Sequence, residues 1–460
     1  MNRMVLYLLL VLMFSCNITR NNNANTSQIV KKSTHIGFSI PVHPLQNDLD
    51  LDILIKEIGD ARIVLLGEAS HGTSEYYTWR AAITKRLIEE KGFDFIAVEG
   101  DWSEANRINN LIHEEKKDSS AIVHLLQLYY RWPTWLWSNY EMIPLISWLN
   151  AYNQNISAGR KIGFYGLDLF SIWESVSELI YHLGDTSILK IARKFQDCFQ
   201  SYRDNEIQYA VAISKGERGC SDEANDLWRS MLHLTHGQQG RNEFQFLIEQ
   251  NSLVAFNGEK YFRTMLSNRV QSWNIRDQHM TETIKRLLRF HGPHSKAIIW
   301  EHNTHVGDAH YTDMSRAGKT NTGELLRKEY GPSHVFIVGF GSFQGSVIAA
   351  ERWGNPYQKM QVPAAVAGSW EEILHEQGAF NKIIFSREII RNRNLNGWIN
   401  QRAIGVVYQP KREKLGNYMP SIIPQRYDAF LFIDQTNALH PIDSPVRSAL
   451  TQSDTTHWDY

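Results

Sequence analysis

Short apolar runs, rich in β-branched and aromatic residues, recur along the chain and alternate with segments of helical periodicity. The apolar runs predict strands at 61–66, 93–98, 161–165, 297–300, 334–340, 403–408 and 429–433. Each run is hydrophobic almost throughout, which is typical of strands covered on both faces. The helical periodicity occupies 75–90, 103–113, 121–130, 142–152 and 172–183. Strands that alternate with helices predict an α/β fold, with a central mostly parallel or mixed sheet flanked by helices.

The tract from about 186 to 290 has helical patterns and no convincing strand. We therefore expect a helical lobe inserted into the α/β domain, which spans residues 35–445 in this interpretation, with a polar tail at 446–460. The 460 residues allow either two to three ordinary domains or one large domain with such an insertion. The lobe is positioned in the sequence between two predicted strands, and we expect it to close over a ligand.

The N-terminus has the pattern of a targeting segment. Arg3 precedes an apolar run at 4–14 that is too short to cross about 30 Å of hydrocarbon, so residues 1–16 predict a secretion signal. Ser15 and Cys16 resemble a bacterial lipoprotein cleavage site, in which Cys16 becomes the lipidated first residue. The alternative is a plain signal in which the cysteine is incidental. Residues 17–34 are rich in Asn, Thr and Ser and predict a flexible tether.

These features predict a lipoprotein of the bacterial cell envelope, on its periplasmic face. The alternative is a cytoplasmic protein whose signal is never processed. No other stretch of eighteen apolar residues occurs, so contact with a membrane is expected only through the lipid.

Composition excludes several classes of protein. A net charge of −1 is unlike that of a strongly basic nucleic-acid binder, and we expect no nucleic-acid partner. Three cysteines are too few for a disulfide-dense scaffold or a cysteine-rich zinc module. Whether Cys198 and Cys220 pair is left open. The 14 Trp, 19 Tyr and 20 Phe suit a large core and equally suit a cleft for a bulky, partly apolar ligand.

Polar side chains follow three of the predicted strands: Glu68 and His71, then Glu99, then His302 and His305. In open α/β sheets, ligands bind beyond the carboxyl ends of the strands. Each residue alone has an ordinary structural explanation, such as a helix cap or an ion pair. Together they predict a shared crevice, since burying histidines and carboxylates without a purpose costs several kcal/mol.

Two mechanisms fit such a cluster. In the first, His71 is a general base that takes a proton from water, Glu68 orients its imidazole, and Arg80 or His302 stabilises an oxyanion. In the second, the carboxylates and imidazoles bind a divalent metal that activates the water. A serine nucleophile has little support, because no Gly-x-Ser-x-Gly motif is present.

Seven segments together resemble the erythromycin esterase family. The resemblance covers nearly all of residues 35–440, in the order of the family's motifs. The segments are GEASHGTSE (67–75), FIAVEGDW (95–102), PTWLW (133–137), GFYGLD (163–168), RDQHM (276–280), HNTHVGD (302–308) and GFGSFQG (339–345).

The resemblance implies a carboxylic ester hydrolase that opens the macrolactone of 14-membered macrolides such as erythromycin and so confers resistance. It implies that His71 is the general base, that Glu68, Glu99 and Arg80 are the acidic residues and the arginine of the cleft, and that His302 and His305 are its further histidines. Glu301 stands where the family has a small residue, and it either raises the pKa of His302 or points away. No cofactor is expected, and a divalent metal is the alternative.

A macrolide needs a wide pocket with apolar walls and a few polar anchors. We expect Asp168 as a polar anchor and Trp102, Trp135 and Tyr165 in the wall, with Trp132, Trp137 and Phe170 as further wall candidates. The alternative for each of these aromatic residues is a place in the core. Two further functions stay open. One is hydrolysis of another ester, with or without a metal, and the other is a non-enzymatic lipoprotein that binds a large amphipathic ligand.

Overall fold

The computed structural model describes residues 39–184, 187–203, 205–235 and 243–443. The predicted signal at 1–16 with Cys16, the tether at 17–34 and the polar tail at 446–460 lie outside these residues. Within them, no helix is both long enough and apolar enough to cross a bilayer.

A nine-stranded mixed sheet forms the centre of the protein, as the sequence predicts, in the order β1-β8-β11-β6-β2-β5-β3-β4 with β7 added beside β6. The strands from β11 to β4 in this order are parallel: β2 (Ile63–Leu66), β3 (Phe95–Asp101), β4 (Gly163–Asp168), β5 (Ala297–Trp300), β6 (Val335–Ala350) and β11 (Ala429–Thr436). Antiparallel strands lie at one side: β1 (His43–Pro44), β7 (Tyr357–Val362) and β8 (Lys382–Phe385).

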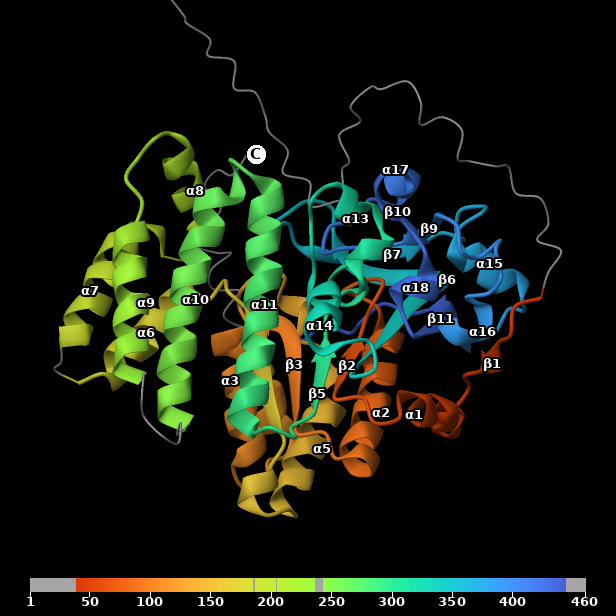
Figure 1. The fold of residues 1–460 in the computed structure, drawn as a ribbon, viewed down its shortest axis with the longest axis horizontal. Helices are drawn as coiled ribbons and strands as arrows, with labels where there is room; N and C mark the ends of the chain where they lie inside the picture. Colours follow the sequence, from red (N-terminus) through yellow and green to blue (C-terminus); the bar gives the residue numbers. More distant parts are fainter. Residues whose placement is uncertain (1–38, 185–186, 204, 236–242, 444–460) are drawn as a thin grey trace, which may run out of the picture.

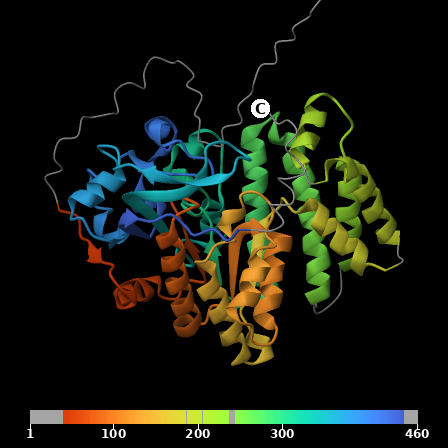
Figure 2. The same cartoon turned by 180° about the vertical axis from the view of Figure 1, so that it is seen from behind.

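Alternate residues of each interior strand pack into two separate cores, one on each face of the sheet. Val64 and Leu66 face the first core, which is covered by α1 (Asp52–Ile58), α2 (Ser74–Lys91), α3 (Trp102–His113), α4 (Ser119–Leu126) and α5 (Met142–Gln154). Figure 2 shows the orange helices of this layer in front of the sheet. Ile63 and Leu65 face the second core, which is covered by α11 (Arg269–His291), α14 (Thr322–Tyr330) and α15 (Trp370–Glu376). Two buried faces explain why the strand sequences are hydrophobic without alternation.

The helical lobe has a hydrophobic core of its own and lies beside the sheet domain (Figure 1). It consists of α6 (Ile172–His182), α7 (Ser187–Phe199), α8 (Glu206–Ser214), α9 (Ser221–Thr235) and α10 (Glu243–Met265). Its helices stand between β4 and β5 in the sequence, and α11 contributes to both the lobe and the sheet layer. A disulfide joins Cys198 and Cys220 within the lobe, the pairing that the sequence leaves open.

The predicted strand at 403–408 is wrong. Ile404 and Val407 form only isolated bridges, and the neighbouring strands are β9 (Ile399–Arg402) and β10 (Tyr418–Ser421), which pair with each other. The apolar run is buried by packing against Val347 and Val362 instead of by a strand ladder. A short apolar run signals burial, and burial alone does not distinguish a strand from an irregular segment.

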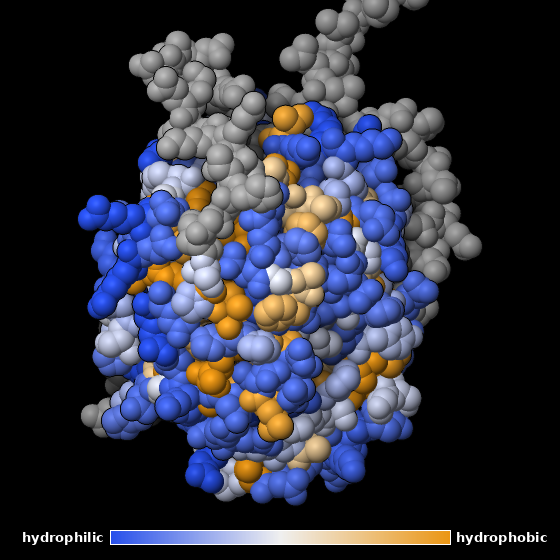
Figure 3. Space-filling view, turned by 90° about the vertical axis from the view of Figure 1, so that its right-hand side faces the viewer, coloured by the Kyte–Doolittle hydropathy of each residue, from blue (hydrophilic) through white to orange (hydrophobic). Residues whose placement is uncertain are grey.

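The remaining elements are short. They are α12 (Asn303–Val306), α13 (Asp313–Arg316), α16 (Ser386–Ile389), α17 (Glu413–Gly416) and α18 (Ile423–Arg426), with 3-10 turns at Asp48–Leu51, Thr134–Leu136, Ala158–Arg160, Gln200–Tyr202, Ala309–Tyr311 and Pro410–Arg412. The face on the side of α15 and α16 is largely hydrophilic, with apolar side chains in separate patches (Figure 3).

Candidate active site

The carboxyl ends of adjacent parallel strands bring the predicted polar residues together. The strand order β2-β5-β3-β4 places their ends side by side, and Leu66 and Val98 both align with Trp300 of β5. The residues that follow, Glu68, His302 and Glu99, therefore emerge at one edge of the sheet. The rings of His71 and His302 lie 4.8 Å apart between their centroids.

Two glycines allow the loop after β2 to fold against the strands beside it. A Cβ atom on Gly67 would lie 2.2 Å from Oδ1 of Asn303, and one on Gly72 would lie 1.9 Å from the carbonyl oxygen of Ile348. Real Cβ atoms do not approach other atoms so closely, so both positions require glycine. The tight packing fixes the loop that carries Glu68 and His71.

Glu68 connects His71 to a buried arginine. Its Oε1 lies 2.8 Å from Nδ1 of His71, and its Oε2 accepts a hydrogen bond of 2.6 Å from Nη2 of Arg80. The side chain of Arg80 is 1% exposed, and its guanidinium lies 4.5 Å from the ring centroids of both Tyr77 and Trp300. Arg80 thus acts on His71 through the carboxylate and does not contact the imidazole.

His302 presents a neutral imidazole to His71. Its Nδ1 accepts the backbone N–H of Thr304 at 3.3 Å, at the start of α12. Burial and the neighbouring His71 hold the pKa of His302 well below its ordinary value, although Glu99 and the carbonyl of Ala69 oppose the shift. The proton of the neutral ring therefore sits on Nε2, and this atom has no hydrogen-bond partner among the described residues.

Glu99 is the centre of the site on the β3 side. Its Oε2 accepts the backbone N–H of His302 at 2.7 Å, and its Oε1 accepts a hydrogen bond of 2.8 Å from Nη2 of Arg276. Burial opposes ionisation of Glu99, but the positive charges of His305 and Arg276 outweigh it and hold its pKa well below the ordinary value. Glu99 is therefore an anion at neutral pH.

His305 lies between two carboxylates. Nδ1 is 2.8 Å from Oδ1 of Asp277, and Nε2 is 3.4 Å from Oε1 of Glu99. Its ring stacks on Trp273 with 4.7 Å between the centroids. Burial lowers the pKa of His305, but the charges of Asp277 and Glu99 raise it by more. The pKa of His305 is therefore above the ordinary value. We conclude that His305 favours its charged form.

Glu301 does not act on His302. Its Oε1 contacts the hydroxyl of Thr322 at 3.4 Å, and burial together with the charges of Asp277 and Glu99 raises its pKa well above the ordinary value. The carboxyl is therefore neutral, and the pKa of His302 is lowered rather than raised.

The predicted wall residues are buried in the core of this structure. Trp135 has no exposed surface and packs on Trp132 and Tyr357. Trp102 and Tyr165 are buried and stack on each other, because their strand and helix positions face the second core. Bulky aromatic residues at strand ends fill the space between sheet and helices here.

Asp168 is not a free anchor. Both of its oxygens accept hydrogen bonds from Arg276, at 2.7 Å from Nε and 2.6 Å from Nη2. Of the other aromatic candidates, Trp137 donates to the carbonyl of Glu99 at 3.2 Å, and the ring of Phe170 lies 5.3 Å from the guanidinium of Arg276.

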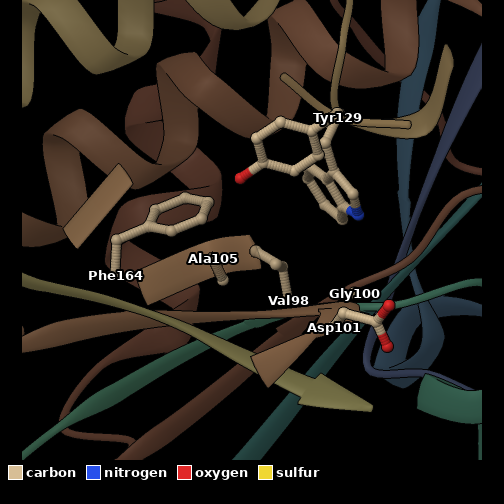
Figure 4. Close-up of a pocket in the computed structure, with 7 residues that line it drawn as sticks. Val98, Gly100, Asp101, Ala105, Tyr129 and Phe164 are labelled. Carbon is tan, nitrogen blue, oxygen red and sulfur yellow. The ribbon is translucent and has the colours of Figure 1, made fainter. Parts of the chain in front are cut away.

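A small cavity lies next to the site (Figure 4). It is lined by Val98, Gly100, Asp101, Ala105, Tyr129, Trp137 and Phe164. Tyr129 and Phe164 face its interior, and the carboxylate of Asp101 lies at its edge. The space between these side chains is too small to admit a water molecule, whereas ordinary ligand pockets have about 300–1,000 Å³. This cavity cannot hold a macrolide, and neither His71 nor His302 lines it.

No three His, Cys, Asp or Glu side chains within the described part of the chain are grouped as a metal site. Glu68 is paired with His71 and Arg80, and Glu99 with His305 and Arg276.

Sequence reasoning missed Arg276 and Asp277 as site residues. Both belong to the segment 276–280 that carries part of the family resemblance, but neither follows a strand. They lie on α11, inside the long helical tract, where periodicity marks the buried face without showing which side chain reaches the sheet edge.

The fold and the site together define a class of protein. A histidine paired with a carboxylate beside a neutral imidazole, at the strand ends of an α/β sheet, is an arrangement that suits an enzyme using general acid–base chemistry.

The chain belongs to the erythromycin esterase family, whose model matches residues 88–436. Family membership supports an ester hydrolase. The matched segment contains Glu99, His302 and His305, whereas Glu68, His71 and Arg80 precede it.

Similar proteins of known sequence include two enzymes of Escherichia coli and one protein of Bacillus subtilis. The chain is 24% identical to erythromycin esterase type II of Escherichia coli, over 78% of this chain and 88% of that one. It is 20% identical to the putative hydrolase YbfO of Bacillus subtilis (strain 168), over 84% and 86%. It is 30% identical to erythromycin esterase type I of Escherichia coli over 26% of this chain and 27% of that one.

Solved structures share the fold at lower identity. A succinoglycan biosynthesis protein has a TM-score of 0.67 at 20% identity, and the match covers 87% of this chain and 96% of that one. A histidine-to-asparagine mutant of the erythromycin esterase EreC in its open conformation has a TM-score of 0.64 at 14% identity, with the same coverage. At these identities the likeness establishes the fold alone.

Proposed function

We propose that the protein hydrolyses the macrolactone ester of 14-membered macrolides such as erythromycin, with His71 activating the attacking water, and that it thereby confers macrolide resistance. The observation that carries the proposal is the pairing of His71 with Glu68 beside the buried imidazole of His302, with the two rings 4.8 Å apart. Family membership supports the ester as the bond that is cleaved.

The geometry assigns a role to each side of the ring pair. Glu68 accepts a hydrogen bond from Nδ1–H of His71, which leaves the Nε2 lone pair of His71 to take a proton from water. The water oxygen forms a bond to the lactone carbonyl carbon, and the carbonyl oxygen becomes an oxyanion that the Nε2–H of His302 stabilises. Collapse of this intermediate breaks the bond between carbon and ring oxygen, and the proton on His71 passes to the leaving alkoxide.

The remaining residues set the electrostatics of the step. Glu68 stabilises the imidazolium that forms at His71, and Arg80 holds Glu68 in place. Glu99 is an anion that fixes the His302 backbone. His305 balances the charge of Glu99 and is not the base.

The test is incubation of the purified protein with erythromycin, followed by mass spectrometry. We expect a product heavier by one water. His71→Ala should abolish its formation while the melting temperature stays close to that of the parent. The matched control is His375→Ala, because His375 also pairs with a carboxylate, Asp434 at 2.6 Å, but lies outside the site. Undiminished hydrolysis by the His71 variant would reject its role as base.

Other outcomes identify the alternatives. Hydrolysis of a different ester, or loss of activity with a chelator, would favour another substrate or metal assistance. Drug that binds and is recovered intact after long incubation would favour a non-enzymatic binding protein.

We also propose that the protein is exported and anchored through Cys16 to the bacterial cell envelope, where it would meet the drug before the ribosomes do. The disulfide between Cys198 and Cys220 supports an oxidising compartment. Metabolic labelling with a lipid precursor should mark the parent and not Cys16→Ser. Unlabelled protein in the cytoplasmic fraction would contradict the proposal.

A further inference from the structure

Arg276 reaches from α11 to the ends of three strands. Its Nε and Nη2 bind both oxygens of Asp168, which ends β4, and Nη2 also binds Oε1 of Glu99 on β3 at 2.8 Å. Its Nη1 lies 3.1 Å from Nε2 of His305, in the short helix that follows β5. The planar guanidinium offers donors in fixed directions, which suits the carboxylates of Asp168 and Glu99.

The contact with Glu99 leads directly to the reactive histidines. While Nη2 of Arg276 holds one oxygen of Glu99, the other oxygen accepts the backbone N–H of His302 at 2.7 Å. The backbone of His302 therefore lies where Glu99 is held, and its ring faces His71. A displacement of Glu99 would move the Nε2–H of His302 away from the reacting carbonyl.

We propose that Arg276 is a positioning residue for the reaction at His71: by clamping Asp168 and Glu99, it holds the His302 ring in register with the catalytic base. The inference rests on the proposed function and adds a residue of α11 to it. The competing explanation is that Arg276 only docks α11 and the lobe onto the sheet.

The charges around Arg276 make the two explanations distinguishable. The groups that face it are Asp168, Glu99, Asp277 and His305, and Glu99 also faces Glu301, His71 and His302. Burial favours the neutral form of Glu99, and His305 and Arg276 keep it ionised. Loss of the arginine charge therefore raises the pKa of Glu99. If the reaction needs ionised Glu99, the acidic limb of the pH profile of kcat/KM moves to higher pH.

The experiment compares two substitutions at Arg276 with the same substitutions at Arg286. Arg286 is the matched control, because it lies on the same helix and pairs with a carboxylate, Glu249 at 2.5 Å, away from the site. Arg276→Gln should lower kcat about 10²-fold with a small change in KM, as expected for a misplacement of about 1 Å. Its acidic limb should shift to higher pH. Arg276→Lys keeps the positive charge but lacks the forked donors of the guanidinium. The acidic limb of its pH profile should therefore lie close to that of the parent, while kcat stays low.

Arg286→Gln and Arg286→Lys should lower stability without moving kcat or the pH profile. If the Arg276 variants behave like these controls, Arg276 is only structural and the proposal is wrong.

A readout without turnover separates this inference from the proposed function. Arg276 lowers the pKa of His305, so NMR titration of 13C-labelled histidine should show His305 titrating at higher pH in Arg276→Gln and unchanged in Arg286→Gln. The backbone amide of His302 should shift in the first variant alone. If the parent hydrolyses no macrolide but these shifts occur, the proposed substrate fails and the positioning role stands; if neither signal moves, the positioning role fails.

Discussion

Replacing Glu68 with Gln removes the carboxylate that links the base to a buried cation. Glu68 accepts from Nδ1 of His71 at 2.8 Å and from Arg80 at 2.6 Å, and its side chain is 4% exposed. A glutamine has one acceptor oxygen, so its amide can satisfy only one of the two donors. If the oxygen turns to Arg80, the amide N–H group meets Nδ1 and drives the imidazole proton to Nε2, where the lone pair is needed.

Two magnitudes follow. Removing one partner of a buried ion pair costs about 3–5 kcal/mol of unfolding free energy, because the remaining charge is left without compensation. The wrong tautomer and the loss of a carboxylate beside the forming imidazolium should lower kcat about 10²–10⁴-fold. Arg80 makes the first effect large, since it is enclosed between two aromatic rings and is 1% exposed.

A double-mutant cycle with Arg80→Met tests both parts. Methionine keeps much of the volume between the rings and removes the charge, while Glu68 still holds His71. We expect Glu68→Gln/Arg80→Met to unfold in urea with a cost below the sum of the single variants by about 1–3 kcal/mol. Its hydrolysis rate should stay as low as that of Glu68→Gln. Additive unfolding costs, or a rate close to that of the parent in Glu68→Gln, would refute the linkage between Arg80, Glu68 and His71.

Three further predictions concern stability. Burial raises the pKa of Glu104 to about 7, so the folded protein holds this proton more tightly than the unfolded chain, and stability falls as the pH rises from about 4.5 to 7. Glu104→Gln should remove this dependence and add up to about 3 kcal/mol at pH 8 in urea unfolding, and an unchanged pH slope would contradict it. The disulfide between Cys198 and Cys220 closes a loop with a sequence separation of 22, so the double serine variant should lose about 3 kcal/mol of unfolding free energy. A melting temperature that reductant does not lower in calorimetry would contradict this. Gly72→Ala puts a Cβ atom 1.9 Å from a carbonyl oxygen of β6 and should cost at least about 1–3 kcal/mol in thermal unfolding, whereas Gly159→Ala, with nothing within 4 Å, should be neutral.

The strand ends could be predicted from the sequence because both signals that mark them are local. A near-continuous apolar run shows where a doubly covered strand lies, and β5 has the predicted bounds of 297–300. The polar residue after each run then falls at the carboxyl edge of the sheet. The order of the strands is not local, but parallel strands put all carboxyl ends at one edge, so Glu68, Glu99 and His302 converge in any order that keeps their strands adjacent.

The rest of the site depends on contacts that sequence patterns do not encode. Arg276 binds Asp168 across 108 positions, and nothing in its helix distinguishes it from Arg286 or Arg289 on the same element. Trp135 and Trp102 have the composition of a ligand wall, but their burial depends on which face of the sheet their neighbours cover. The antiparallel strands β7 and β8 are short, and β7 is mostly polar, so they give a weaker sequence signal than the long apolar runs.

The two histidines of the segment 302–308 look alike in the sequence, and the structure separates them by their surroundings. Titratable groups whose environments push their pKa values apart take different roles in a site. The pKa of His302 is lowered by burial and by His71, whereas that of His305 is raised by Asp277 and Glu99 against the effect of its burial. A neutral ring with a free N–H can donate to a developing oxyanion, and a charged ring between two carboxylates cannot leave them. In the proposed mechanism the same short segment therefore supplies the donor for the oxyanion and the imidazole that favours ionised Glu99, and the backbone N–H of His302 on Glu99 couples the two.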